Sequence, residues 1–139
     1  TGDLLAAMKS EAGGKLDALG FTTYPHLEFD ALADVPAAHW TEIAAHWSGP
    51  VLFTEVAWPA APHAPYPGDE LEQADFVSTF LDGVAGLEVE YATWLFLHDW
   101  DQEAASTVIA ATGLRDNLGL VLRPADLIWR AEVALRQRP

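Results

Sequence analysis

A short apolar stretch in the middle of the chain, residues 51–57 (VLFTEVA), decides the fold. Pro50 precedes this stretch, and Trp58-Pro59 follows it. A run of β-branched and aromatic residues between such breaks predicts a buried strand. Glu55 interrupts the run near its end, although an unpartnered carboxylate is costly to bury. Its side chain therefore either reaches solvent at the end of the strand or has a chemical function.

Two further stretches, one on each side of this strand, have the same character. Residues 16–24 (LDALGFTTY) end at Pro25, and residues 89–97 (VEYATWLFL) lead into residues 98–101 (HDWD). Their nearly continuous apolar character is typical of strands covered on both faces, as in a parallel sheet. The sequence thus predicts three strands.

Helical patterns separate the predicted strands. Residues 3–12 predict a short first helix. Asp34 caps a second helix, which has Pro36 in its first turn and continues to Trp47. The seven-residue spacing of Trp40 and Trp47 indicates that both indoles pack against the sheet.

Two more helices complete the pattern. Asp69 and Glu72 form a variant of the capping box at the start of a helix that ends at Gly86, and Pro124 opens the last helix. One helix followed by three βα units implies right-handed parallel crossovers and an α/β fold. A complete (β/α)8 barrel needs roughly 250 residues. Residues 1–139 therefore form a single domain, either a small open sheet, which the length favours, or a partial TIM barrel, which the strand ends favour.

Composition excludes several classes of function. The chain has 139 residues, of which 50% are hydrophobic, and its formal net charge is −14. An excess of carboxylates repels polyanions, so we expect neither nucleic acid nor an anionic membrane surface as a partner. No apolar run approaches the roughly 18 residues of a membrane span, and the chain has no cysteine for a disulfide or a thiolate metal site.

No metal or cofactor is expected either. Imidazole and carboxylate side chains suit zinc, and His26, His63, His98 and Asp99 could supply them. Their separations show no HxH or HExxH pattern, however, and the sequence has no Gly-rich phosphate loop before a helix. The candidate chemistry must therefore come from the side chains alone.

Side chains that could take part in catalysis or binding follow each predicted strand. The carboxyl ends of parallel strands meet at one edge of a sheet, where loops build active sites. There the Tyr24 hydroxyl could donate a hydrogen bond to Glu55, which would keep the carboxylate ionised and oriented. Indoles and carboxylates together are typical of sugar sites, because aromatic faces stack on pyranose rings. The other residues at the three strand ends are His26, Trp58, Trp94, His98, Asp99 and Trp100.

Four segments of the chain resemble the last part of the retaining glycoside hydrolases of the large (β/α)8 clan. The segments are LGFTTYPHLEF (19–29), GPVLFTEVAWPA (49–60), VEYATWLFLHDWD (89–101) and ATGLRDNLGLVLRPADLIW (111–129). They are similar to the sixth, seventh and eighth strands and the closing helix of that clan. The endo-galactanase-like and related uncharacterised bacterial branches are the most similar.

The resemblance implies a role for each residue at the strand ends. The seventh strand of this clan ends in the catalytic nucleophile, a Glu in a context like Thr-Glu-x-x-Trp, and residues 54–58 match that context with Glu55. Tyr24 corresponds to the tyrosine that hydrogen-bonds the nucleophile. Trp94 corresponds to the indole beneath the reacting sugar. The residues implied to line the same sugar subsite are His26, Trp58, His98 and Asp99.

One part of the family pattern is missing. The acid/base of the clan is a Glu that follows an Asn, and the dipeptide Asn-Glu does not occur in this sequence. A retaining mechanism needs two carboxyl groups about 5 to 5.5 Å apart, and nothing in the spacing of Glu28, Asp99 or Asp101 argues for a replacement. We therefore expect a glycosidase-like chain that is inactive alone and that self-associates or pairs with the rest of a barrel. The alternative is a non-catalytic carbohydrate-binding or structural α/β module.

Overall fold

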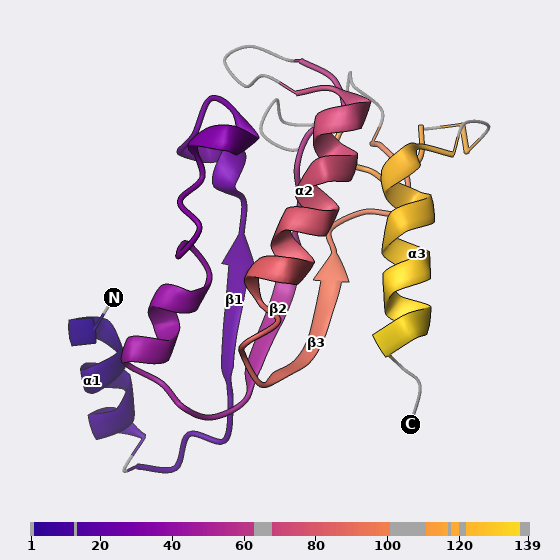
Figure 1. Cartoon of the computed structure of the whole chain (residues 1–139). Helices are drawn as coiled ribbons and strands as arrows, with labels where there is room; N and C mark the ends of the chain where they lie inside the picture. Colours follow the sequence, from indigo (N-terminus) through magenta and orange to yellow (C-terminus); the bar gives the residue numbers. More distant parts are fainter. Residues whose placement is uncertain are drawn as a thin grey trace.

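The computed structural model describes residues 2–12, 14–62, 68–100, 111–116, 118–119 and 122–136. Its centre is a sheet of three parallel strands in the order β1-β2-β3 (Figure 1), formed by Leu19–Thr23, Val51–Val56 and Val89–Trp94. The α-helices are α1 (Gly2–Glu11), α2 (Glu70–Gly83) and α3 (Pro124–Arg136), and short 3-10 helices cover Pro25–Leu27, Leu32–Asp34 and Thr41–Ala45. The predicted α/β fold with three parallel strands is confirmed.

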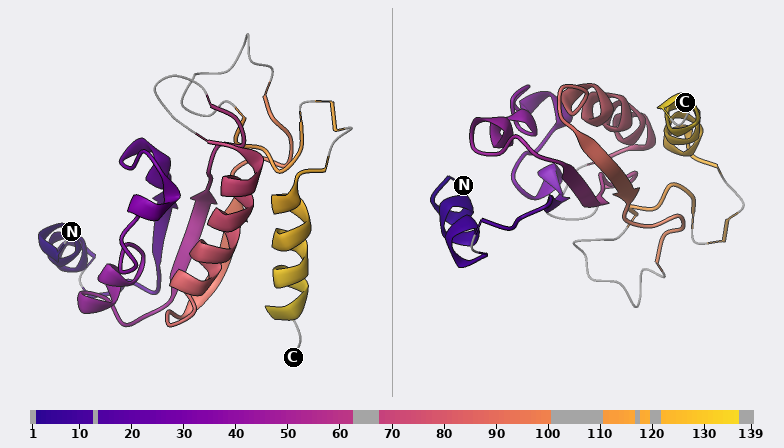
Figure 2. Two further views of the ribbon diagram at one scale, coloured as in Figure 1. Left: turned by 45° about the horizontal axis from the view of Figure 1, so that its top comes forward. Right: turned by 90° about the horizontal axis from the view of Figure 1, so that it is seen from below.

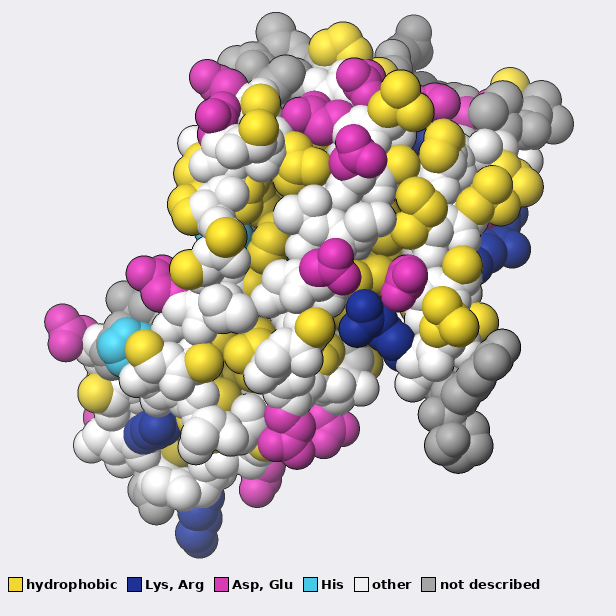
Figure 3. All heavy atoms as spheres, in the orientation of Figure 1, with side chains coloured by type: hydrophobic (Ala, Val, Ile, Leu, Met, Phe, Trp, Pro, Cys, Tyr) yellow, Lys and Arg dark blue, Asp and Glu magenta, His cyan; other side chains and the backbone are white. Residues whose placement is uncertain are grey.

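Helices cover one face of the sheet. α2 lies over the sheet, roughly along the strands, with α3 packed beside it, whereas α1 lies beyond β1 (Figure 2). Carboxylate side chains are spread over this helix-covered face among apolar ones (Figure 3). The arrangement is that of consecutive βα units, in which each connection returns along the same side of a parallel sheet.

The core lies between β2 and α2. Val51, Phe53 and Val56 of β2 are buried, and the ring centroid of Phe53 lies 5.0 Å from that of Phe80 on α2. Phe76, one helical turn before Phe80, is also fully buried. Because every second residue of a strand faces the same side, these positions commit one face of β2 to the core.

Asp69 begins α2 as the sequence predicts. Its carboxylate accepts hydrogen bonds from the backbone N–H groups of Leu71 and Glu72, each at 2.8 Å. The Glu72 carboxylate reaches further than a capping box, to the backbone N–H of Leu32 (2.9 Å) and the indole N–H of Trp58 (3.3 Å). It thereby ties α2 to the segments before and after β2.

The predicted helix from Asp34 to Trp47 is wrong in type. Val35 is extended, with φ −69° and ψ 118°, because a residue that precedes a proline is biased out of the helical region. Asp34 ends a 3-10 turn rather than capping a helix, and only Thr41–Ala45 forms a further 3-10 segment. The packing of Trp40 is confirmed, since its buried indole donates to the Thr23 hydroxyl at 3.1 Å.

Other boundaries differ from prediction by a few residues. β1 begins at Leu19 rather than at residue 16, and β3 ends at Trp94 rather than at residue 97. The candidate side chains of His63 and Asp101 lie outside the described residues. In the part of the chain that the structure describes, every helix is too short or too polar to cross a membrane.

Gly83 and Gly86 form a matched pair for testing the packing of α2. A Cβ atom at Gly83 would lie 2.6 Å from Cε3 of Trp40, whose indole is fixed by Thr23, whereas a Cβ at Gly86 meets nothing within 4 Å. We expect Gly83→Ala to lower the free energy of unfolding by about 1–3 kcal/mol through overpacking. Gly86→Ala should change it by less than about 0.5 kcal/mol. Urea denaturation followed by circular dichroism measures both values, and equal stabilities would contradict the contact.

Candidate active site at the carboxyl edge of the sheet

A β-bulge in β2 determines where the Glu55 side chain points. Phe53 pairs regularly with β1, but the next β1 residue, Thr22, pairs with Glu55, so Thr54 is an extra residue in β2. Without the bulge, strand alternation would place Glu55 on the buried face together with Phe53. With it, Val56 occupies the buried face and Glu55 turns to the opposite one.

Tyr24 contacts Glu55 from the neighbouring strand. The residue directly follows β1 and precedes the 3-10 helix Pro25–Leu27, so it lies at the carboxyl edge of the sheet. Its hydroxyl donates a hydrogen bond to Oε2 of Glu55. The contact that the sequence predicts is therefore present.

The Tyr24 phenol keeps the proton that it donates in this hydrogen bond. Burial raises its pKa well above the ordinary value of 10.0, and the hydrogen bond to Glu55 and the negative charge of that carboxylate raise the pKa further. The phenol therefore stays protonated at neutral pH. A donor of this kind orients the carboxylate that accepts its hydrogen bond.

His26 lies between two aromatic rings at the same edge. Its ring centroid is 6.1 Å from that of Tyr24 and 6.0 Å from that of Trp58. The imidazole is buried, so almost none of its surface could contact a sugar. Its position at the end of β1 is as predicted, but its contacts are with the protein.

The structure corrects the predicted sugar contacts of Trp58 and Trp94, because both indoles lie in the core. Trp58 is fully buried and stacks on Phe76, with ring centroids 5.2 Å apart. Trp94 is 7% exposed, and its indole N–H donates to the carbonyl of Thr112 at 2.8 Å. Because Trp94 pairs with Val56, it shares the helix-covered face of the sheet. The alternation of strand residues therefore turns this indole away from Glu55.

Asp99 is engaged by an arginine that the sequence analysis did not single out. Both of its carboxylate oxygens accept hydrogen bonds from Arg123, at 2.8 Å and 2.6 Å, and one also accepts from the backbone N–H of Gly113 at 2.9 Å. His98, which precedes Asp99, is exposed, and its Nδ1 lies 3.3 Å from the carbonyl of Asp116. The only sequence signal for Arg123 is that most of the seven cations follow residue 114.

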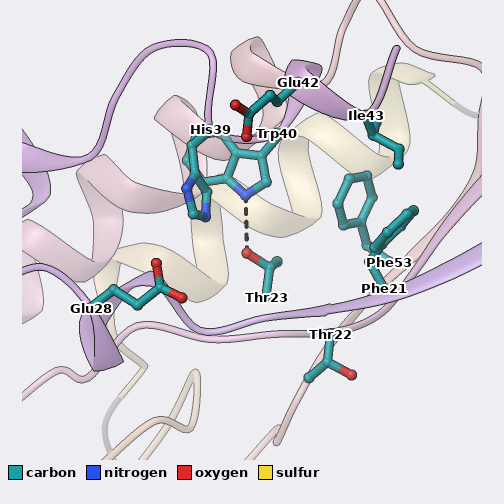
Figure 4. Close-up of a pocket in the computed structure, with 9 residues that line it drawn as sticks. All are labelled: Phe21, Thr22, Thr23, Glu28, His39, Trp40, Glu42, Ile43 and Phe53. Atoms are coloured by element: carbon teal, nitrogen blue, oxygen red, sulfur yellow. Dashed lines mark hydrogen bonds between the residues drawn. The ribbon is translucent and has the colours of Figure 1, made fainter. Parts of the chain in front are cut away.

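The other candidate acids do not stand beside Glu55. Glu28 lines a separate pocket of about 310 Å³ next to β1, together with His39 and Trp40 (Figure 4). Asp101 lies outside the described residues. Among the residues that the structure does describe, no group of three or more His, Asp or Glu side chains could hold a metal ion.

Comparison with solved structures identifies similar folds. Two structures of GH5_18 from Streptomyces cattleya, one in complex with GlcNAc and one a variant in complex with Manb1-4GlcNAc, align with TM-scores of 0.55 and 0.54 at 29% and 30% sequence identity. Each alignment covers 74% of this chain, which spans only 25% and 26% of those proteins. A GH113 β-1,4-mannanase aligns over 98% of this chain and 50% of its own, at 16% identity and a TM-score of 0.45, too low to support an argument. The sequence matches no protein-family profile and no curated protein.

These likenesses agree with the arrangement of the strands. The fold resembles that of glycoside hydrolase domains, and its three parallel βα units correspond to part of a TIM barrel. The chain spans about a quarter of the length of the GH5_18 structures it resembles. The narrower resemblance to the endo-galactanase-like branch stays a prediction.

The hydrogen bond between Tyr24 and Glu55 predicts a pH dependence. Because the pKa of Tyr24 is higher in the folded chain than in the unfolded chain, the neutral phenol stabilises the fold fully below about pH 10. This contribution is lost as the pH rises through the raised pKa. The difference in phenolate absorbance between the parent and Tyr24→Phe should therefore show a transition above the ordinary value. Glu55→Gln should move that transition downward, and a transition already at the ordinary value in the parent would contradict the contact.

Proposed function

We propose that this chain is the C-terminal part of a (β/α)8 retaining glycoside hydrolase in which Glu55 is the nucleophile and Tyr24 orients it. The observation that carries the proposal is the hydrogen bond between the Tyr24 hydroxyl and Oε2 of Glu55 at the carboxyl edge of a parallel sheet. Active sites of TIM barrels lie at this edge. The likeness to GH5_18 supports the same assignment.

In this mechanism, Glu55 attacks the anomeric carbon of a bound sugar. The bond from that carbon to the leaving oxygen breaks, and an ester between the sugar and Glu55 forms. Water then attacks the same carbon, loses a proton to the second carboxyl group of the catalytic pair, and releases the Glu55 carboxylate. Tyr24 holds one carboxylate oxygen throughout, and its raised pKa keeps its proton on the phenol.

The leaving oxygen needs a proton from a second carboxyl group. Asp99 is committed to Arg123, and Glu28 lines a different pocket. We therefore infer that the acid/base lies in another part of the barrel, as the absence of an Asn-Glu dipeptide also indicates. The described chain then supplies only half of the catalytic pair.

The likeness to GH5_18 supports a proposal for the class of sugar. The two GH5_18 structures are complexes with GlcNAc and with Manb1-4GlcNAc. We infer that this chain acts on a related carbohydrate, a β-mannoside linked to GlcNAc. Of the two histidines predicted to contact the sugar, His26 is buried and His98, in the segment after β3, is exposed.

The rest of the barrel would pair with the open parts of this sheet. Among the described strands, β1 and β3 each have only β2 as a neighbour. On the face opposite the helices, Tyr91 lies beside Leu52 and is 49% exposed. A groove of about 400 Å³ lies next to β3, with apolar walls from Val89 and Trp129. Unpaired edges of this kind associate with further strands.

One observation favours a second function, a non-catalytic carbohydrate-binding module. Neither of the described acids considered as a second catalytic carboxyl group stands beside Glu55. Asp99 is paired with Arg123, and Glu28 lines a separate pocket. A binding module would need the same edge of the sheet but no acid/base. Hydrolysis by the full-length protein separates the two functions.

Substitution of Glu55 tests the proposed mechanism in the full-length protein. We expect Glu55→Gln to lower kcat/KM for an aryl β-mannoside by at least about a thousandfold. Tyr24→Phe should lower it by about tenfold to a hundredfold, and Glu28→Gln, the matched acidic control, should leave it near the parent value. A fluorinated glycoside should label Glu55 covalently, as mass spectrometry of the digest would show. Unchanged hydrolysis by Glu55→Gln, or a label on another residue, would falsify the assignment.

Self-association of the isolated chain tests whether its sheet is part of a larger barrel. We expect residues 1–139 alone to self-associate in sedimentation velocity, because the sheet edges and the face around Tyr91 are open. Tyr91→Lys should reduce this association, whereas Leu71→Lys on the exposed side of α2 should not. Coexpression with the upstream part of the barrel should give one defined species. A stable monomer at high concentration would argue against pairing.

A further inference from the structure

The segment after β3 carries an aromatic pair, Phe96, which is half-buried, and Trp100, which is exposed. The ring centroids of Phe96 and Trp100 lie 5.2 Å apart, with 42° between the ring planes. Trp100 is 48% exposed, in contrast to Trp58 and Trp94, which the core buries. Of the three indoles that follow or end β2 and β3, only that of Trp100 is therefore open to a ligand.

The start of this segment is bonded to the residue after the candidate nucleophile. The backbone N–H of Leu95 donates to the carbonyl of Val56 at 2.9 Å, and Val56 directly follows Glu55. Phe96 is the next residue along, and its carbonyl accepts from the N–H of Leu114 at 3.2 Å. The aromatic pair therefore begins beside the end of β2, at the edge that carries Glu55.

An ion pair fixes the backbone next to Trp100. Asp99 binds Arg123 through both carboxylate oxygens, and its backbone N–H donates to the carbonyl of Arg115 at 3.0 Å. The side chains of Arg123 and Asp99 are only 7% and 10% exposed, so water screens the pair weakly. Glu70, at the start of α2, lies 3.5 Å from Nε of Arg123 on its other side. Trp100 thus follows a residue that is held from several directions.

We propose that Phe96 and Trp100 form a sugar-stacking surface beside Glu55, and that the ion pair of Asp99 with Arg123 holds this surface in position. The proposal rests on the proposed function, because it takes the carboxyl edge of the sheet as the carbohydrate site. An indole offers a large flat apolar area to the C–H groups of a pyranose ring. A fixed backbone lowers the entropy that binding would otherwise cost. Asp99 is then a positioning residue rather than a sugar ligand.

The occupant that this surface fits is a pyranose of an oligosaccharide, next to the ring that Glu55 attacks. The charge of Asp99 is already satisfied by Arg123, so the surface offers stacking rather than an ionic contact. A neutral sugar suits such a surface better than an anionic ligand, since the chain carries a formal charge of −14. Trp100 should therefore matter for oligosaccharides and little for a single sugar with a small leaving group.

The test uses the full-length protein carrying Glu55→Gln, so that binding is measured without turnover. Calorimetric titration with a manno-oligosaccharide ending in GlcNAc should give about tenfold weaker affinity for Trp100→Ala. Trp100→Phe should keep most of the affinity, because the aromatic face remains. Leu127→Ala, an exposed apolar position on α3, is the matched control and should bind as the parent does.

Kinetics with an intact Glu55 separate positioning from folding. Trp100→Ala should raise KM for the oligosaccharide with little change in kcat. Asp99→Asn should raise the same KM with little change in kcat, and it should also lower the thermal unfolding midpoint, which Trp100→Ala should leave unchanged, because it removes the buried partner of Arg123. Equal affinity of Trp100→Ala and the parent would overturn the proposal. If Glu55→Gln keeps full hydrolysis while Trp100→Ala weakens binding, the stacking surface stands and the assignment of the nucleophile fails.

Discussion

The direction of the Glu55 side chain depends on the bulge at Thr54, and the bulge depends on the packing of Val56. Val56 is fully buried against the core, and full burial of a valine stabilises a fold by about 1.5–3 kcal/mol. A regular strand would exchange the two side chains, losing that burial and forcing a carboxylate into an aromatic core. Hydrophobic packing one residue further on therefore holds the acid at the edge of the sheet, where Tyr24 meets it.

The sequence predicts β2 well because Pro50 and Trp58-Pro59 mark its two ends, whereas the bounds of β1 and β3, which lack such residues on one side, differ from prediction by a few residues. It fails between Asp34 and Trp47, where helical spacing of the large side chains is correct but the backbone is not helical. Trp40 packs where an amphipathic helix would place it, since a 3-10 turn can present the same residue to the sheet. Periodicity thus reports which residues are buried more reliably than it reports the hydrogen-bonding pattern of the backbone between them.

The candidate site likewise contains some contacts that the sequence predicts and others that it does not. The Tyr24 contact with Glu55 follows from the rule that the carboxyl ends of parallel strands converge, so the sequence predicts it. The burial of Trp58 and Trp94 cannot be predicted in this way, because bulges in β2 and β3 change which residues share a face. Arg123 escapes prediction for another reason: its partner lies 24 residues earlier, and no local pattern joins them.

The hydrogen-bond partners of the carboxylates distinguish the structural acids from the candidate nucleophile. Asp99 is paired with Arg123, and the buried Asp126 is held by Arg115 (3.3 Å) and Arg130 (2.9 Å). A carboxylate neutralised by guanidinium groups is a good anchor but a weak nucleophile, because its charge is already stabilised. Glu55 instead accepts a hydrogen bond from a neutral phenol, which orients the carboxylate and leaves its negative charge in place. Among these acids, the kind of partner therefore distinguishes the one suited to attack from those suited to hold the rim together.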